Sequence, residues 1–220
     1  MDAWQITMFT VATAALATVL MLPPGLFLAW LLARSRVRGM VVVDTLVSLP
    51  LVMPPVATGF ILLAIVAPRG PVGRVLARAG IEIVFTWKAV VIAMAVMGLP
   101  LLVRTVRAGI EQVDRRYEAA AATLGAGPLR VFFTITLPLA RPAVIAGAVL
   151  GFARALGEFG ATIMIAGSIP GSTRTLAVAI YSFAETGRDR EAAALIAVSA
   201  VIAFVALCLS NWMSSRISAA

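Results

Sequence analysis

The chain has 220 residues, of which 61% are hydrophobic and only 13% are charged. Soluble domains have about 45–50% apolar residues and about 25% charged residues. A soluble chain of this length could not bury so much apolar surface. The composition therefore excludes an ordinary soluble domain and indicates an integral membrane protein.

The formal net charge is +8 at pH 7, and such an excess indicates nucleic-acid binding when the basic residues form one patch. Here the arginines stand between apolar runs instead, as Arg34, Arg36 and Arg38 do after the first run. This placement is typical of membrane–water boundaries with anionic headgroups. We therefore expect the lipid bilayer, and no nucleic acid, as a partner.

Several kinds of chemistry are excluded by residues that the chain lacks. It has no histidine and a single cysteine, Cys208, so a His/Cys metal site, an internal disulfide and a Ser/His/Asp triad are impossible. It also lacks the G-x-x-x-x-G-K-[ST] phosphate loop, so it has no evident way to use ATP itself. We expect no enzyme activity, no catalytic residue, no metal and no cofactor on this chain. Cys208 is interpreted as a small buried hydrophobic residue.

Five apolar stretches are long enough to cross a bilayer as helices, which takes about 20 residues: 5–33, 42–67, 83–106, 138–166 and 192–214. The first carries Asp2 before it and is too long for a cleavable signal peptide. The run 176–183 is too short to cross and predicts a short helix or re-entrant segment, with a sixth span as the alternative. Without repeats or linkers, the sequence predicts an all-α polytopic membrane protein with one domain over 1–220.

Prolines are expected to interrupt two of these spans, at 23–25 and around 50–59. Each proline removes a backbone donor and clashes with the preceding turn, and in lipid the freed carbonyls need neighbouring helices or a water-lined cavity. One interpretation is a kinked helix that only packs well. The other is a gate or pathway wall formed by Pro50, Pro54, Pro55 and Gly59.

An odd number of spans places the two termini on opposite sides of the membrane. Lysines and arginines are enriched in cytoplasmic loops, and this bias favours an external N-terminus and a cytoplasmic C-terminus. The bias is modest in this chain. Charge alone therefore favours this orientation without deciding it.

The polar stretch between the third and fourth spans contains the clearest motif. A helix containing the alanine run 119–122 is expected there, since alanine is the best helix former, and Gly125, Gly127 and Pro128 end it. A second short helix follows over 129–136, with Leu129, Phe132, Phe133 and Thr136 near one face, and Pro138 starts the next span. Two short helices at a sharp angle form a rigid projection that suits a groove on another protein.

This stretch resembles the EAA loop of the membrane subunits of binding-protein-dependent ABC importers. The family pattern is E-A-A, three residues, Gly, nine residues and Ile-x-Leu-Pro. Ala120 and Ala121 match the alanines, whereas Ala119 stands at the glutamate position and Glu118 precedes it. The resemblance implies a type I ABC importer permease-like fold whose cytoplasmic loop, about 109–137, docks on the ATPase subunit. An amphipathic helix resting on the membrane is the plainer alternative. The implied coupling positions are Glu118, Ala119, Ala120, Ala121, Gly125, Gly127, Ile135, Leu137 and Pro138.

Five stretches are similar to molybdate permeases in particular: 49–56, 123–127, 131–138, 152–162 and 169–176. The resemblance implies a homodimeric pathway for molybdate in the cytoplasmic (inner) membrane. Its implied partners are an external oxyanion-binding protein and a cytoplasmic ABC ATPase dimer that uses ATP and Mg. Sulfate, thiosulfate or tungstate is the alternative solute, because those permeases share parts of 157–160. A self-sufficient secondary transporter is a further alternative, although such proteins usually contain internal repeats.

Arg154 and Glu158 stand four residues apart on the expected fourth span, so they can form an ion pair. An ionisable pair inside a membrane is costly and is a functional-site hypothesis by default. It either locks helix packing or the dimer seam, or it belongs to the pathway or outer gate, together with Gly157 and Gly160. A net-neutral pair would not trap a dianion, which suits a conduit.

Overall fold

The computed structural model describes residues 2–35, 37 and 39–218, and every regular element in this part of the chain is a helix. Arg36 and Arg38, which were assigned to a membrane boundary, lie outside the described residues. The predicted all-α class is confirmed.

Three helices are long and apolar enough to cross a membrane, and two bent helix pairs can each supply one more crossing. The long helices are α1 (Ala3–Arg34), α5 (Trp87–Gln112) and α12 (Asp189–Ser218). One bent pair is α2 (Met40–Val52) with α3 (Pro55–Val66), at 116°, and the other is Pro128–Leu139 with α9 (Arg141–Leu156), at 76°. The described chain thus has three such helices, and it reaches the five expected crossings only if each bent pair counts as one span. The short helix expected over 176–183 is α11 (Leu176–Glu185).

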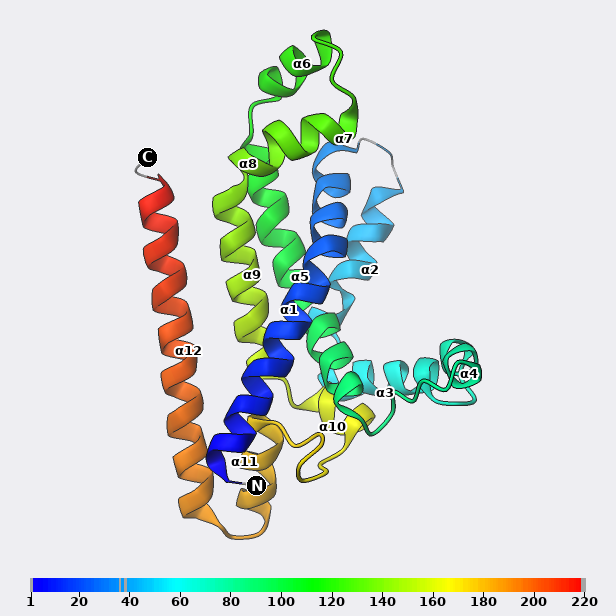
Figure 1. The fold of residues 1–220 in the computed structure, drawn as a ribbon, viewed down its shortest axis with the longest axis vertical. Coiled ribbons are helices and arrows are strands. Elements are labelled where there is room, and N and C mark those ends of the chain that lie inside the picture. The colour runs from blue at the N-terminus through cyan, green and yellow to red at the C-terminus, as the bar shows by residue number, and fades with distance from the viewer. Residues whose placement is uncertain (1, 36, 38, 219–220) are drawn as a thin grey trace.

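The core forms where α5 packs between α1 and α9. Large apolar side chains of α5 are fully buried there, among them Met94, Met97 and Leu102. Helix α12 runs beside α9 and α11 and leaves most of its surface exposed (Figure 1). Cys208 is exposed on α12, so the expectation of a buried cysteine is wrong.

The first span is one continuous helix, which corrects the expected interruption at 23–25. Pro23 and Pro24 lie inside α1, although a proline in a helix interior typically costs about 3 kcal/mol. Close packing against α5 offsets that cost: a Cβ on Gly25 would lie only 2.5 Å from Cδ2 of Leu102. Tertiary contact therefore outweighs the local preference to break.

The second span breaks where prolines were expected to break it. Met53 is extended, Pro54 follows it, and Pro55 begins α3 in a new direction. Helix α3 then packs on α10 (Gly160–Ala166). The two backbones touch, because a Cβ on Gly59 would lie 2.7 Å from Cα of Ala161.

The fourth span differs from the continuous helix expected over 138–166. Helix α9 starts at Arg141 after the bend, with Pro142 in its first turn, and ends at Leu156. Residues 157–159 are not helical, and α10 begins at Gly160. At this turn the Glu158 side chain accepts a hydrogen bond from the Ala161 amide, which stabilises the start of the new helix.

The two ends of the bundle differ in character. One end, here called the loop end, carries α6 (Arg115–Thr123) and α7 (Pro128–Val131) beyond the tips of α1, α5 and α9 (Figure 1). The N-terminus, α10 and α11 lie at the opposite end, whereas the C-terminus lies toward the loop end. The short helix α4 (Pro71–Arg78) projects to the side. The start of α1 and the end of α12 thus lie toward opposite ends of the bundle.

We predict that Gly59→Ala destabilises the protein by about 1–3 kcal/mol, the usual cost of overpacking. The added methyl would meet the backbone of α10, which cannot move aside as a flexible side chain can. Gly39→Ala is the matched control, since a Cβ at Gly39 meets nothing within 4 Å. Thermal unfolding of both purified variants in detergent measures the difference. Equal midpoints would show that α3 and α10 are not in backbone contact.

Candidate functional site

The loop end is built around α6 and a tight turn that follows it. Asp114 caps the helix by accepting from the Arg116 amide at 2.9 Å. After Thr123 the Gly125 amide donates to the carbonyl of Ala122 at 3.0 Å, and the Ala126 amide to that of Ala121 at 3.1 Å. This is the Schellman arrangement, and Gly125 takes its left-handed position with φ of +83°. The turn predicted at this glycine is confirmed.

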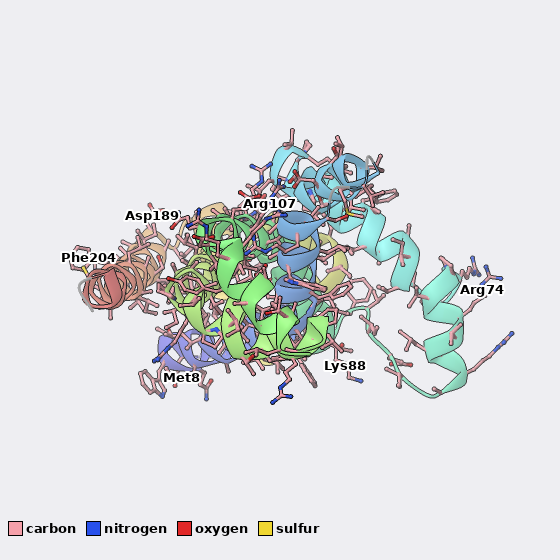
Figure 2. All side chains as sticks on the ribbon, turned by 90° about the horizontal axis from the view of Figure 1, so that it is seen from above. Met8, Arg74, Lys88, Arg107, Asp189 and Phe204 are labelled. Carbon is pink, nitrogen blue, oxygen red and sulfur yellow. The ribbon has the colours of Figure 1, made fainter. Side chains whose placement is uncertain are left out.

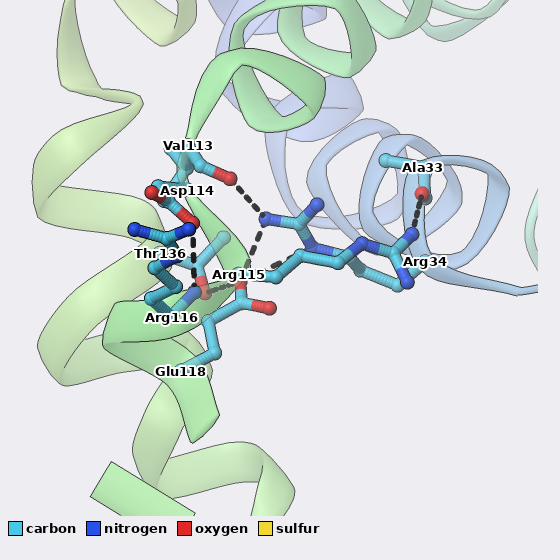
Figure 3. Close-up of polar contacts among 8 residues, drawn as sticks. All are labelled: Ala33, Arg34, Val113, Asp114, Arg115, Arg116, Glu118 and Thr136. Carbon is cyan, nitrogen blue, oxygen red and sulfur yellow. Dashed lines mark hydrogen bonds and ion pairs between the residues drawn. The ribbon is translucent and has the colours of Figure 1, made fainter. Parts of the chain in front are cut away.

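The carboxylate of Glu118 fastens α6 to the bundle (Figure 3). Its Oε1 accepts from Arg34 Nη2 at 2.8 Å and Nε at 3.1 Å, and from the Thr136 hydroxyl at 2.6 Å. Arg34 is the last residue of α1 and also donates to the carbonyl of Val113 at 3.2 Å. Charge-assisted bonds of this kind are about twice as strong as neutral ones. Glu118 thus contacts its own chain, while Ala119 beside it is exposed.

The second short helix is longer than expected and contains a π turn. It runs from Pro128 to Leu139 through α7, the π-helix η1 (Phe132–Thr136) and α8 (Leu137–Leu139). The single face expected for 129–136 is therefore wrong, because a π turn holds an extra residue and shifts the positions that follow. Phe132 and Thr136 are buried, and Phe132 packs on Trp30 with ring centroids 5.6 Å apart. Leu129 and Phe133 are exposed.

Apolar side chains face outward from the loop end. Leu124 in the tight turn is 89% exposed, and Leu129 and Phe133 are largely exposed as well; these three form what we call the loop surface. Helix α6 buries none of its residues. Exposed apolar groups rimmed by charges mark interaction sites. Of the expected coupling positions, Ala119, Ala120, Gly125, Gly127 and Pro138 are exposed, and Ala121, Ile135 and Leu137 are half-buried.

The expected Arg154–Glu158 ion pair is present, with Arg154 Nη1 2.8 Å from Glu158 Oε2. Glu158 lies beyond the end of α9, however, so the two residues do not share one helix. Its carboxylate is 1% exposed and also accepts from the Ala161 amide at 2.7 Å. The pair therefore joins α9 to the first turn of α10, which favours a role in positioning that helix.

The other expected gate residues differ in burial and in how close they lie to the contact between α3 and α10. Gly160 is buried, and a Cβ there would lie 2.7 Å from Cβ of Pro55. Pro54 is exposed at the break, Pro50 lies inside α2, and Gly157 borders open space. Beside them Phe159 packs on Tyr181, whose ring centroid is 4.9 Å away. The Tyr181 hydroxyl donates to Glu185, and this bond raises the pKa of Tyr181.

Polar side chains also link α2 to α5, a feature that was not predicted from the sequence. Arg107 lies beside α2 (Figure 2) and forms ion pairs with Asp44 at 2.9 Å and with Glu111 at 2.8 Å. Arg104, one turn away, donates to the Ser48 hydroxyl at 3.0 and 3.3 Å. The signal in the sequence is Arg104 within an apolar span and Asp44 and Ser48 four residues apart in another.

Comparison with known proteins identifies the family. The model of the binding-protein-dependent transport system inner membrane component matches residues 22–219. The chain belongs to this family. It is 46% identical to the molybdenum transport system permease protein ModB of Escherichia coli K12, over 98% of this chain and 94% of that protein. It is 37% identical to the sulfate transport system permease protein CysT of Salmonella typhimurium, over 87% of this chain and 69% of that protein.

Solved structures show the same fold. A chain of a bacterial alginate ABC transporter in complex with alginate pentasaccharide-bound periplasmic protein matches with a TM-score of 0.73 at 21% identity, over 97% of this chain and 78% of that one. A chain of the MetNI methionine ABC transporter matches with a TM-score of 0.72 at 15% identity, over 98% and 94%. The predicted type I ABC importer permease fold is confirmed.

We predict that Glu118→Ala destabilises the protein by about 3 kcal/mol, because it leaves the Arg34 guanidinium without its partner in a largely buried site. The exposed fractions of the Arg34 and Glu118 side chains are 13% and 18%. Glu191→Ala is the control: it breaks the ion pair with Arg188, whose side chains are about half exposed, and such pairs contribute about 0–1 kcal/mol. Chemical or thermal unfolding in detergent compares the two. A loss for Glu118→Ala no larger than the control's would contradict the anchoring role.

Proposed function

We propose that this protein is the membrane subunit of an ATP-driven importer and forms the pathway by which molybdate enters the cytoplasm. The choice of molybdate as the solute rests on the 46% identity to a molybdenum permease along nearly the whole of both chains. The chain itself offers no phosphate loop, so the energy must come from a separate ATPase dimer that uses ATP and Mg. Selectivity then resides in an external oxyanion-binding protein.

Sulfate or thiosulfate is the second candidate solute, and the similarity to CysT supports it. Tungstate is a third, because it is a tetrahedral dianion like molybdate. The similarity to CysT is lower in identity and covers less of the relative. Molybdate is therefore the stronger proposal.

The loop over about 109–137 is proposed to dock on the ATPase. Three structural features support this: the helix turn at Gly125 is fixed by its own hydrogen bonds, Glu118 ties the loop to α1, and the loop surface is apolar and exposed. A rigid projection of this kind would pass a movement of the ATPase on to the helices to which it is fixed, whereas a mobile loop would change its own conformation instead. The positions proposed to serve coupling are Glu118, Ala119, Ala120, Ala121, Gly125, Gly127, Ile135, Leu137 and Pro138.

The pathway is proposed to run between two copies of the chain, since at most five crossings per copy enclose little space. Its outer gate is placed where α3 and α10 meet. Orientation follows from the loop: if it meets a cytoplasmic ATPase, the loop end and the C-terminus are cytoplasmic and the N-terminus is outside. The proposed gate and pathway positions are Pro50, Pro54, Pro55, Gly59, Arg154, Gly157, Glu158 and Gly160.

Labelling of engineered cysteines tests this orientation in intact cells. In a Cys208→Ser background, Asp2→Cys should react with a membrane-impermeant thiol reagent from outside. Leu124→Cys, at the most exposed loop position, should react only after the membrane is opened. External labelling of Leu124→Cys would reverse the topology and remove the proposed ATPase contact.

Transport and coupling are tested together in proteoliposomes that contain the chain, its ATPase and the oxyanion-binding protein. We expect ATP-dependent uptake of molybdate in preference to sulfate. Gly125→Arg should still assemble but lose at least tenfold of both uptake and solute-stimulated ATP hydrolysis, because the large residue occupies the left-handed turn that meets the ATPase.

Gly80→Arg is the matched control for that variant. Gly80 also has a positive φ, of 71°, and a Cβ added there would also meet nothing within 4 Å, but it lies between α4 and α5 rather than in the loop. Both variants carry the same backbone strain and charge. Equal losses in the two would attribute the effect to strain and contradict docking at Gly125.

A further inference from the structure

Arg104 is an exposed cation near the inner end of a membrane-crossing helix. Trp87 and Lys88 begin α5 at the end opposite the loop, and such residues are typical of a membrane boundary. A crossing of about 20 residues counted from there reaches Arg107. Arg104 therefore lies in the last turn of the crossing, on the side toward the loop end, and its residue is exposed in the single chain.

Within the described part of the chain, no carboxylate lies within ion-pair distance of Arg104. Its neighbour Arg107 differs, because it contacts both Asp44 and Glu111. Arg104 instead donates to the neutral Ser48 hydroxyl, from Nη2 at 3.0 Å and from Nε at 3.3 Å. An ionisable residue inside a membrane is costly, and where it persists it faces a water-filled pathway or a partner group.

The free donors of Arg104 suit a tetrahedral oxyanion. A guanidinium carries five N–H donors in a rigid fork, two of which are directed to Ser48, so three remain. This fork matches oxyanions with two parallel hydrogen bonds. Ser48 is buried and holds one edge of the guanidinium against α2, so the opposite edge is presented away from that helix.

The surrounding charges favour a brief contact over tight binding. Arg104 and Arg107 contribute two positive charges, and Asp44 and Glu111 contribute two negative ones. The cluster is thus neutral as a whole, while one guanidinium within it keeps unused donors. Conduction requires a site that attracts a solute and still releases it.

We infer that Arg104 is a transient contact for the tetrahedral oxyanion at the inner mouth of the pathway, and that Ser48 positions its guanidinium. The inference rests on the proposed function, because it assumes that an oxyanion passes this face of α5. It assigns Arg104 a direct contact and gives Ser48 an indirect role. Of the expected gate positions, Pro50 lies on α2 two residues after Ser48, whereas Gly160 lies in α10 toward the other end of the bundle.

Substitutions in the reconstituted importer test the contact. Arg104→Gln should lower ATP-driven molybdate uptake at least tenfold, while the yield of assembled complex and the ATPase rate stimulated by the loaded binding protein stay within twofold. Ser48→Ala should lose about two- to fourfold. Arg141→Gln, which removes the same charge from the exposed start of α9, should stay within twofold. If Ser48→Ala loses as much as Arg104→Gln, the arginine only fastens α2 to α5 and the inference is overturned.

A second variant restores charge after folding, so a folding defect cannot produce the result. Arg104→Cys in a Cys208→Ser background is purified, reconstituted and treated with a cationic aminoethyl or an anionic sulfonatoethyl thiosulfonate. The cationic reagent should raise uptake at least fivefold and the anionic one should not, and molybdate should slow both modifications. If neither reagent reacts with the cysteine at position 104, that position is not accessible to water and the inference is overturned. Absence of uptake by the unmodified importer would instead reject the proposed function.

Discussion

The Glu118 carboxylate is the point at which the loop end is fixed to the transmembrane helices. One oxygen accepts from the last residue of α1 and from the π turn before α9. The same arginine donates to the carbonyl of Val113, where α5 ends. The C-terminal ends of α1 and α5 and the π turn that leads to α9 are therefore joined through one side-chain cluster, and α6 is fastened to it. The alanine-rich helix has no buried residue of its own, so its position depends on this anchor.

At the opposite end of the molecule, α3 and α10 are held together by close backbone contact rather than by an ion pair. Gly59 and Gly160 let α3 and α10 approach until a methyl group would not fit. Glu158 sets the start of α10 and binds Arg154 at the end of α9. Thr58 and Thr162 in these two helices have buried hydroxyls without a hydrogen-bond partner in the described chain. Such groups cost free energy when buried, so this contact is tight in shape yet incomplete in polar pairing, and it is the seam at which the outer gate is proposed.

Much of this architecture could be predicted because its causes are local. Composition and the length of apolar runs predict the membrane class and five crossings, and Gly125 predicts a turn that the hydrogen bonds confirm. Features that depend on distant residues could not be predicted. Pro23 and Pro24 remain helical because α5 packs against Gly25, and the π turn at Phe132–Thr136 moves two side chains from the expected face. The Arg104–Ser48 bond joins residues 56 positions apart.

These contacts form a continuous structural connection between the two ends. The loop is tied through Arg34 to α1 and to the last turn of α5, and α5 is tied through Arg107 and Arg104 to α2. Helix α2 leads directly into α3 at the proline break, and α3 packs on α10. The contacts thus run without interruption from α6 to the α3–α10 seam by way of α5 and α2, and under the proposed function a shift of α6 would reach the gate along them. Arg104 lies on this route, so a change in the tilt of α5 relative to α2 would change the direction in which its free N–H donors point. Under the proposed function, movement of α5 and α2 would link opening of the α3–α10 seam to release of the anion near Arg104.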